Sequence, residues 1–178
     1  MRVGTRWIAI PGLVVLAAAA AMLSAYAGAS SSQGNSPVQP VRFPHPRHAA
    51  GNLKMNCLYC HYAANKSPDP GLPAVATCMG CHTVIGTDKP EIQKLASYWN
   101  KKQPVPWVRI HKLPEYVHFP HMRHVNAGVT CQTCHGDVQK MEQVSQASSL
   151  NMGWCVNCHV GRSNPPLKAR YDCAVCHF

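Results

Sequence analysis

Aromatic side chains are scarce in this sequence. Phe, Trp and Tyr make up 7% of the 178 residues, whereas there are 12 glycines and 15 prolines. A chain with so little bulky apolar material is poorly equipped to build an ordinary hydrophobic core. We therefore expect that something other than side chains fills the interior of the fold.

Acidic residues are also few. The chain has 7 Asp and Glu against 17 Lys and Arg, which gives a formal net charge of +10 and a pI of about 9.3. Such a charge suggests nucleic-acid binding, but the N-terminal segment predicts export, which excludes that partner in practice. We expect the Lys and Arg side chains to pair instead with the acidic groups of a bound cofactor.

Charge is absent between Arg6 and Arg42, and residues 7–29 form an apolar run. As a helix this run would be about 34 Å long, enough to cross a bilayer. Residues 1–29 are thus predicted to be an uncleaved transmembrane anchor, followed by a linker at 30–42. Arg2 and Arg6 place the N-terminus in the cytoplasm and residues 43–178 on the periplasmic side of a bacterial cytoplasmic membrane. A removed signal peptide, cleaved after the A-Y-A at 25–27, is the alternative.

No cysteine precedes Cys57, which excludes a lipoprotein anchor. All ten cysteines belong to one repeated pattern. That pattern, C-x-x-C-H, is the attachment signal for c-type haem. Its cysteines are Cys57, Cys60, Cys78, Cys81, Cys131, Cys134, Cys155, Cys158, Cys173 and Cys176, and its histidines are His61, His82, His135, His159 and His177. The cysteines would bind the haem vinyl groups and each histidine would be a proximal iron ligand.

The cysteines have two other possible interpretations. Zinc fits the pairs at 57–60 and 78–81, and a disulfide framework is possible outside the cytoplasm. Neither explains a histidine after every pair, and zinc would leave one of the five pairs without a partner. The sequence therefore predicts five covalently bound haem c groups.

Six histidines lie outside these motifs, and four of them occur in two near-copies, FPHPRH at 43–48 and FPHMRH at 119–124. Each copy precedes two haem motifs, so the chain is predicted to contain a duplicated di-haem module at about 43–82 and 119–159, with a fifth haem at 173–177. Histidines three apart on a helix can reach two different haems. The predicted distal ligands are His45, His48, His121, His124 and His111.

The fifth distal ligand is the least determined of these. His118 competes with His111, and Met55, Met141 and Met152 lie near haem motifs as further rivals. With six spare histidines for five irons, no iron needs to stay open to a substrate. The chain is accordingly predicted to relay electrons and not to be an enzyme alone, with no catalytic residue.

The segment between the two copies has two predicted parts. In TDKPEIQKLASYWNKK, Asp88 is predicted to cap a helix that has Pro90 in its first turn and an apolar face. QPVPWVRIHKLP follows and should be extended because of its prolines. We expect both parts to cover haem faces, and docking of a partner subunit is the alternative role.

The anchor-like segment, the five haem motifs, the FPHxRH pairs, NCLYCH, GLPAVATCMGCH, VRIHKLP and MGWCVNCH together resemble the pentahaem cytochrome c subunit of bacterial alternative complex III, a quinol:electron-acceptor oxidoreductase. The FxHxxH unit is similar to class III cytochromes c. The resemblance implies a mostly α fold with much irregular chain, a class III-like haem domain and one N-terminal transmembrane helix.

The same resemblance implies partners. They are an iron–sulfur subunit of molybdopterin-enzyme descent, multi-span quinol-binding membrane subunits, and a monohaem cytochrome c. Electrons would pass from the iron–sulfur subunit through this chain to a cytochrome or other soluble acceptor, with no nucleic acid involved. The alternative is a stand-alone, membrane-anchored multihaem quinol dehydrogenase of the NapC/NrfH type.

Overall fold

The computed structural model describes residues 6–29, 32–163 and 166–178, with side chains described for 12–23 of the first segment. The chain divides into two compact units, residues 1–32 and 33–178. Arg2 and the first two positions of the predicted linker lie outside the described residues.

In the first unit the described residues form helix α1 (Arg6–Ala29). Among the described residues, no helix combines the length and the apolar character that crossing a membrane requires. The middle of α1, residues 17–21, is a run of alanine, the least apolar of the aliphatic side chains. The prediction of a transmembrane anchor is therefore wrong, and the localisation on the cytoplasmic membrane that depended on it is corrected with it.

The second unit is built from short helices joined by irregular chain, as the sequence predicts. In chain order its helices are α2 (His45–Ala49), α3 (Cys57–Cys60), α4 (Val75–His82), α5 (Pro90–Asn100), α6 (His121–Asn126), α7 (Cys131–His135), η1 (Val138–Lys140), α8 (Met152–His159) and η2 (Cys173–Val175). Over the described ranges no strand forms, apart from one isolated antiparallel bridge between Val160 and Lys168.

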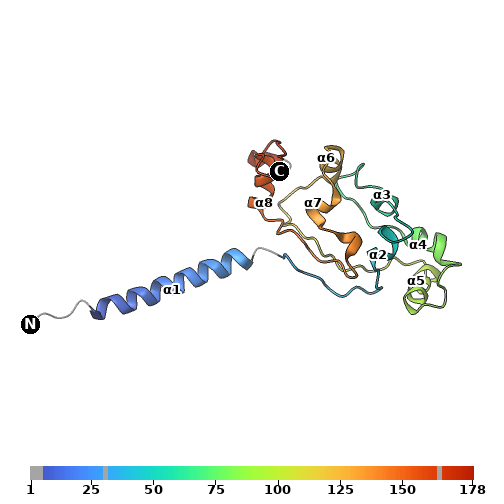
Figure 1. Ribbon diagram of the computed structural model, residues 1–178, viewed down its shortest axis with the longest axis horizontal. Coiled ribbons are helices and arrows are strands. Elements are labelled where there is room, and N and C mark those ends of the chain that lie inside the picture. Colours follow the sequence, from blue (N-terminus) through green and yellow to red (C-terminus); the bar gives the residue numbers. More distant parts are fainter. Residues whose placement is uncertain (1–5, 30–31, 164–165) are drawn as a thin grey trace, which may run out of the picture. The chain divides into compact units, whose positions relative to one another are not determined.

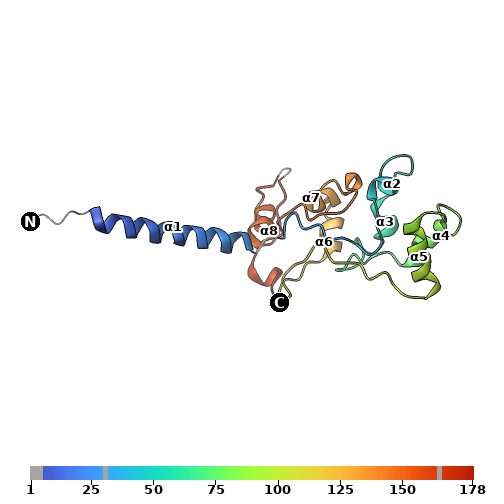
Figure 2. The same cartoon turned by 90° about the horizontal axis from the view of Figure 1, so that it is seen from below.

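The hydrophobic core is small and lies at one end of this unit. Helices α4 and α5 pack side by side, as both views show (Figure 1, Figure 2). Met79 of α4 and Leu95 of α5 are buried there together with Val41 and Val105. Elsewhere in the described part the only other buried hydrophobic residue is Ala64. The helices that carry the other haem motifs therefore contribute no buried apolar side chain to this core.

The helix predicted in the segment after Thr87 is present as α5, but its N-cap is not the predicted Asp88. The residue at the N-cap is Lys89, which makes no side-chain capping hydrogen bond. Asp88 lies one residue before this cap, and its carboxylate forms an ion pair with the Lys89 ammonium at 2.9 Å. Prolines keep residues 103–110 free of helix and strand, as predicted.

Residues 33–42 belong to the second unit through backbone contacts with distant chain. Gly34 N–H donates to Gln146 O at 2.7 Å, and Gln146 N–H donates to Asn35 O at 2.9 Å. The Gln146 side chain is fully buried and donates to Ser148 O at 3.0 Å. This ladder ties the segment before the first FPHxRH copy to the segment before α8.

Candidate functional site

Each haem motif lies on a helix or helical turn. Asn56 caps α3 by accepting from Leu58 N–H at 2.9 Å, and Asn151 caps α8 by accepting from Trp154 N–H at 2.8 Å. The helical turn brings the two cysteines of a motif to the same face. All ten cysteines are free of disulfide bonds. The motifs thus present pairs of available thiols, as covalent haem attachment requires.

The motif histidines share a second feature: every Nδ1 has a hydrogen-bond partner. In four of the five the partner is a backbone carbonyl, which can only accept, so Nδ1 is the donor and Nε2 is the nitrogen left to bind a metal. The four pairs are His61 with Gly71 O (3.4 Å), His82 with Ile85 O (2.9 Å), His159 with Arg170 O, and His177 with Tyr116 O (3.0 Å). Metal-binding histidines are oriented in this way by their outer partners.

In the first FPHxRH copy, His45 and His48 contact the Phe43 ring, and His48 also contacts a backbone carbonyl. The Phe43 ring stacks on His48 with centres 4.5 Å apart and meets His45 edge-on at 4.9 Å. His48 Nδ1 lies 3.5 Å from Pro44 O, and its ring centre is 6.1 Å from that of His82. His45 Nδ1 is buried without a hydrogen-bond partner. Burial first, then the nearby His61, lowers the pKa of His45 to about 4.

The second copy repeats this geometry. Phe119 stacks on His124 at 4.2 Å and meets His121 edge-on at 4.9 Å. His124 Nδ1 lies 3.0 Å from Pro120 O, and its ring centre is 6.1 Å from that of His159. His121 Nδ1 lies 3.1 Å from Pro68 O, and its ring is 6.4 Å from that of His135 with the planes 13° apart.

These ring separations fit an iron with two imidazole ligands. Two metal–nitrogen bonds of about 2 Å, with about 1 Å from each nitrogen to its ring centre, place the ring centres about 6 Å apart. The measured separations are 6.1, 6.4 and 6.1 Å for His48 with His82, His121 with His135, and His124 with His159. The donor set and its spacing therefore suit bis-histidine haem c.

Burial also keeps these histidines in the form that binds a metal. It is the first cause that lowers the pKa values of His48, His121 and His124, and it lowers the pKa of His135 to about 4. A neutral imidazole has a free nitrogen lone pair, whereas an imidazolium has none. At neutral pH these side chains are ready to act as ligands.

The remaining predicted candidates lie elsewhere. His111 Nε2 is 3.2 Å from His135 Nδ1, with the ring centres 4.4 Å apart. His118 N–H donates to Cys176 O at 2.9 Å, and its ring stacks on Phe178 at 4.3 Å. Met152 begins α8 and is 67% exposed.

The other two methionines have different neighbours. Met55 N–H donates to His48 O at 2.9 Å. Met141 lies beside Gly136, and a Cβ added to that glycine would be 3.3 Å from the methionine Cε. The sequence did not lead us to predict that Phe43 stacks on His48 and Phe119 on His124. The phenylalanine that both FPHxRH copies share could have indicated it.

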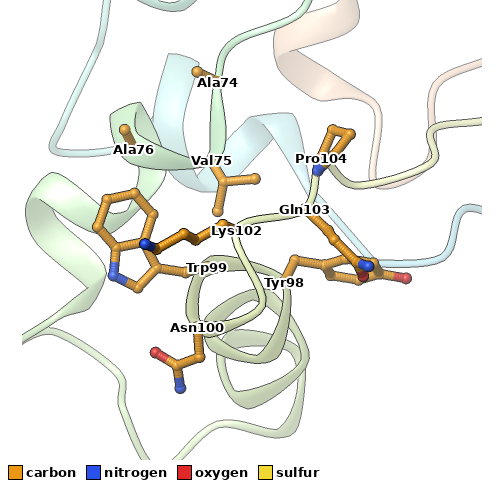
Figure 3. A pocket seen from close by; sticks show the side chains of 9 residues that line it. All are labelled: Ala74, Val75, Ala76, Tyr98, Trp99, Asn100, Lys102, Gln103 and Pro104. Atoms are coloured by element: carbon orange, nitrogen blue, oxygen red, sulfur yellow. The ribbon is translucent and has the colours of Figure 1, made fainter.

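A separate hollow of about 690 Å³ lies between the start of α4 and the end of α5 (Figure 3). Its walls are largely apolar and include Val75, Tyr98, Trp99 and Lys102. None of its nine lining residues is a motif cysteine or a histidine. It is therefore distinct from the histidine pairs described above.

Comparisons with known proteins agree with this chemistry. Residues 22–112, about half of the chain, match the class III cytochrome c family, and residues 117–178 match cytochrome c7 and related cytochromes c. The chain is also 27% identical over 161 residues to the menaquinone reductase multihaem cytochrome c subunit of Nitratidesulfovibrio vulgaris, covering 78% of this chain and 76% of that protein. This chain thus belongs to the class III cytochrome c family, and it is a multihaem electron-transfer cytochrome that binds haem c covalently.

Proposed function

We propose that this chain is a five-haem electron-transfer subunit of a quinol:electron-acceptor oxidoreductase of the alternative complex III type. The observation that carries the proposal is the set of facing imidazoles about 6 Å apart, each with Nδ1 bonded to another group. Such pairs would hold an iron between two imidazoles and would leave no place on it for a substrate. Bound haem c supplies a reversible one-electron iron couple.

The proposed ligand scheme has the same form in both FPHxRH copies. The first histidine of each copy serves the next haem motif, so His45 pairs with His61 and His121 with His135. The second histidine serves the motif after that, so His48 pairs with His82 and His124 with His159. The near-identical contacts of Phe43 and Phe119 support a duplicated di-haem module at about 43–82 and 119–159.

The chain's own residues hold this arrangement in place. The carbonyls of Pro44 and Pro120 fix the tautomers of His48 and His124 by accepting from Nδ1. Stacked phenylalanine rings restrict rotation of the same imidazoles. Little side-chain rearrangement is then needed when an electron arrives or leaves, which suits a relay.

The proposed partners are an iron–sulfur subunit of molybdopterin-enzyme descent, multi-span quinol-binding subunits and a monohaem cytochrome c. One relative is named as a subunit of a menaquinone reductase. This supports the proposal that the chain acts within a complex and is not a stand-alone quinol dehydrogenase. We propose that electrons enter from the iron–sulfur subunit and leave to a cytochrome or other soluble acceptor.

Mass spectrometry and affinity purification from native cells test this function. The denatured chain should carry five haem additions, and a Cys173→Ala/Cys176→Ala double variant should carry four. The tagged chain should co-purify with an iron–sulfur subunit, and the complex should oxidise quinol while the isolated haem-loaded chain should not. Four or fewer additions on the natural chain, or quinol oxidation by the chain alone, would contradict the proposal.

Spectroscopy tests the ligand scheme. His48→Ala and His124→Ala should each keep all haems attached but convert one haem to a high-spin form that binds carbon monoxide. Arg47→Ala and Arg123→Ala are matched controls, because these exposed residues lie on the same two helices. A fully low-spin spectrum for His48→Ala or His124→Ala would rule the scheme out.

A further inference from the structure

One of the five motif histidines has an unusual partner. His61, His82, His159 and His177 direct Nδ1 to backbone carbonyls. In His135 the partner is the imidazole of His111, with 3.2 Å between His135 Nδ1 and His111 Nε2. The two rings are nearly perpendicular, at 82°. An aromatic base therefore occupies the place that a peptide oxygen holds in the other four.

The direction of this hydrogen bond follows from the other side of the His135 ring. That ring lies 6.4 Å from the nearly parallel ring of His121, the spacing that suits an iron between their Nε2 atoms. If Nε2 of His135 binds iron, its neutral ring keeps the proton on Nδ1. His135 Nδ1–H then donates, and His111 Nε2 accepts.

The same bond bears on what His111 can do. Its Nε2 lone pair is engaged by His135, and the ring centres are only 4.4 Å apart, too close to hold an iron between them. Desolvation by burial is the first cause that lowers the pKa of His111, which agrees with a neutral ring. The geometry is that of a partner behind the proximal ligand, where the sequence predicts a distal ligand.

We propose that His111 is a positioning residue that accepts a hydrogen bond from His135 and lowers the reduction potential of the haem at the third motif. An imidazole nitrogen is a much stronger base than a peptide oxygen, so the His135 ring becomes more electron-donating toward its iron. Electron donation by an axial ligand stabilises the ferric state. His111 thereby sets this haem apart from the four whose proximal histidines bond to carbonyls. The inference rests on the proposed presence of a haem at 131–135.

Redox titration of the haem-loaded full chain tests this role. His111→Phe removes the acceptor, and His111→Gln replaces it with an amide oxygen that resembles the carbonyls of the other motifs. In His111→Phe one haem should become easier to reduce by roughly tenfold in its redox equilibrium constant, or about 59 mV for one electron. His111→Gln should shift the same haem by less. His121→Met, which changes an axial ligand of the third haem in the proposed scheme, identifies the wave that belongs to it.

Coordination must stay unchanged in both variants. All haems should remain low-spin, with no new carbon monoxide binding, because His111 holds no iron. A high-spin, carbon monoxide-binding haem in both His111→Phe and His111→Gln would show that His111 is an axial ligand and overturn the inference. Five attached haems with unmoved potentials would overturn it as well. A peptide containing residues 131–135 that carries no haem would instead refute the proposed function, and this inference with it.

Discussion

Gly136, directly after His135, should not tolerate a side chain. Its backbone has φ 69° and ψ −169°, a region that is essentially restricted to glycine. A Cβ added there would lie 2.7 Å from Ala147 Cβ and 3.3 Å from Met141 Cε. Methionine can move, but Ala147 Cβ is attached directly to a backbone whose carbonyl accepts from Gln33 Nε2 at 2.8 Å. Gly136→Ala therefore combines backbone strain with a clash that is hard to relieve.

The expected cost follows from these two contributions. The strained backbone costs about 1–3 kcal/mol, and overpacking adds about 1–3 kcal/mol. The free energy of unfolding should thus fall by about 2–6 kcal/mol. With a urea dependence of about 2 kcal/mol/M, the unfolding midpoint should fall by about 1–3 M. Urea titration of the haem-loaded protein, followed by far-UV circular dichroism, measures this shift.

Gly128 provides the matched control. It also has a positive φ, 84°, but a Cβ there meets no atom within 4 Å. Gly128→Ala should therefore cost only the left-handed backbone penalty of about 1–2 kcal/mol, a midpoint shift below about 1 M. Equal shifts for the two variants, or a Gly136→Ala midpoint equal to that of the natural chain, would refute the reasoning.

Three further substitutions test the packing of the second unit by urea unfolding. Leu95→Ala should lower the free energy of unfolding by about 2–5 kcal/mol, because Leu95 is 5% exposed within a small core; a loss below 1 kcal/mol would contradict this. Gln146→Leu should cost about 1–3 kcal/mol, because it removes the buried donor to Ser148 O, and an unchanged midpoint would count against that role. Glu142→Gln should change the stability by less than about 1 kcal/mol, since its ion pair with Arg42 is exposed; a larger loss would mean that the pair is more than a surface contact.

The cofactor chemistry could be predicted from the sequence because it is local. A motif such as Cys57 to His61 holds two cysteines and a histidine within five residues, so no tertiary information is needed to recognise it. The same holds for the helix α5, where apolar spacing and Pro90 give the helix but not its cap. Whether Asp88 capped the helix or paired with Lys89 depended on side-chain geometry that spacing does not contain.

The contact between His111 and His135 was not predictable. The two residues are 24 positions apart, and counting histidines against irons gave no reason to place His111 beside His135. Gly136 could have drawn attention only as a glycine directly after a haem motif. For α1, an uncharged run predicted a membrane crossing, whereas the described helix lacks the necessary apolar length.

The brevity of the motif helices has a consequence for how the protein is made. Helices α3, α7 and α8 have 4, 5 and 8 residues. Isolated helices shorter than about 12–15 residues are marginal in water. A newly made chain therefore offers its cysteines on largely unstructured segments, open to the machinery that attaches each cofactor, and gains order as attachment proceeds. A chain that misses one attachment should stay partly open and become a substrate for proteases.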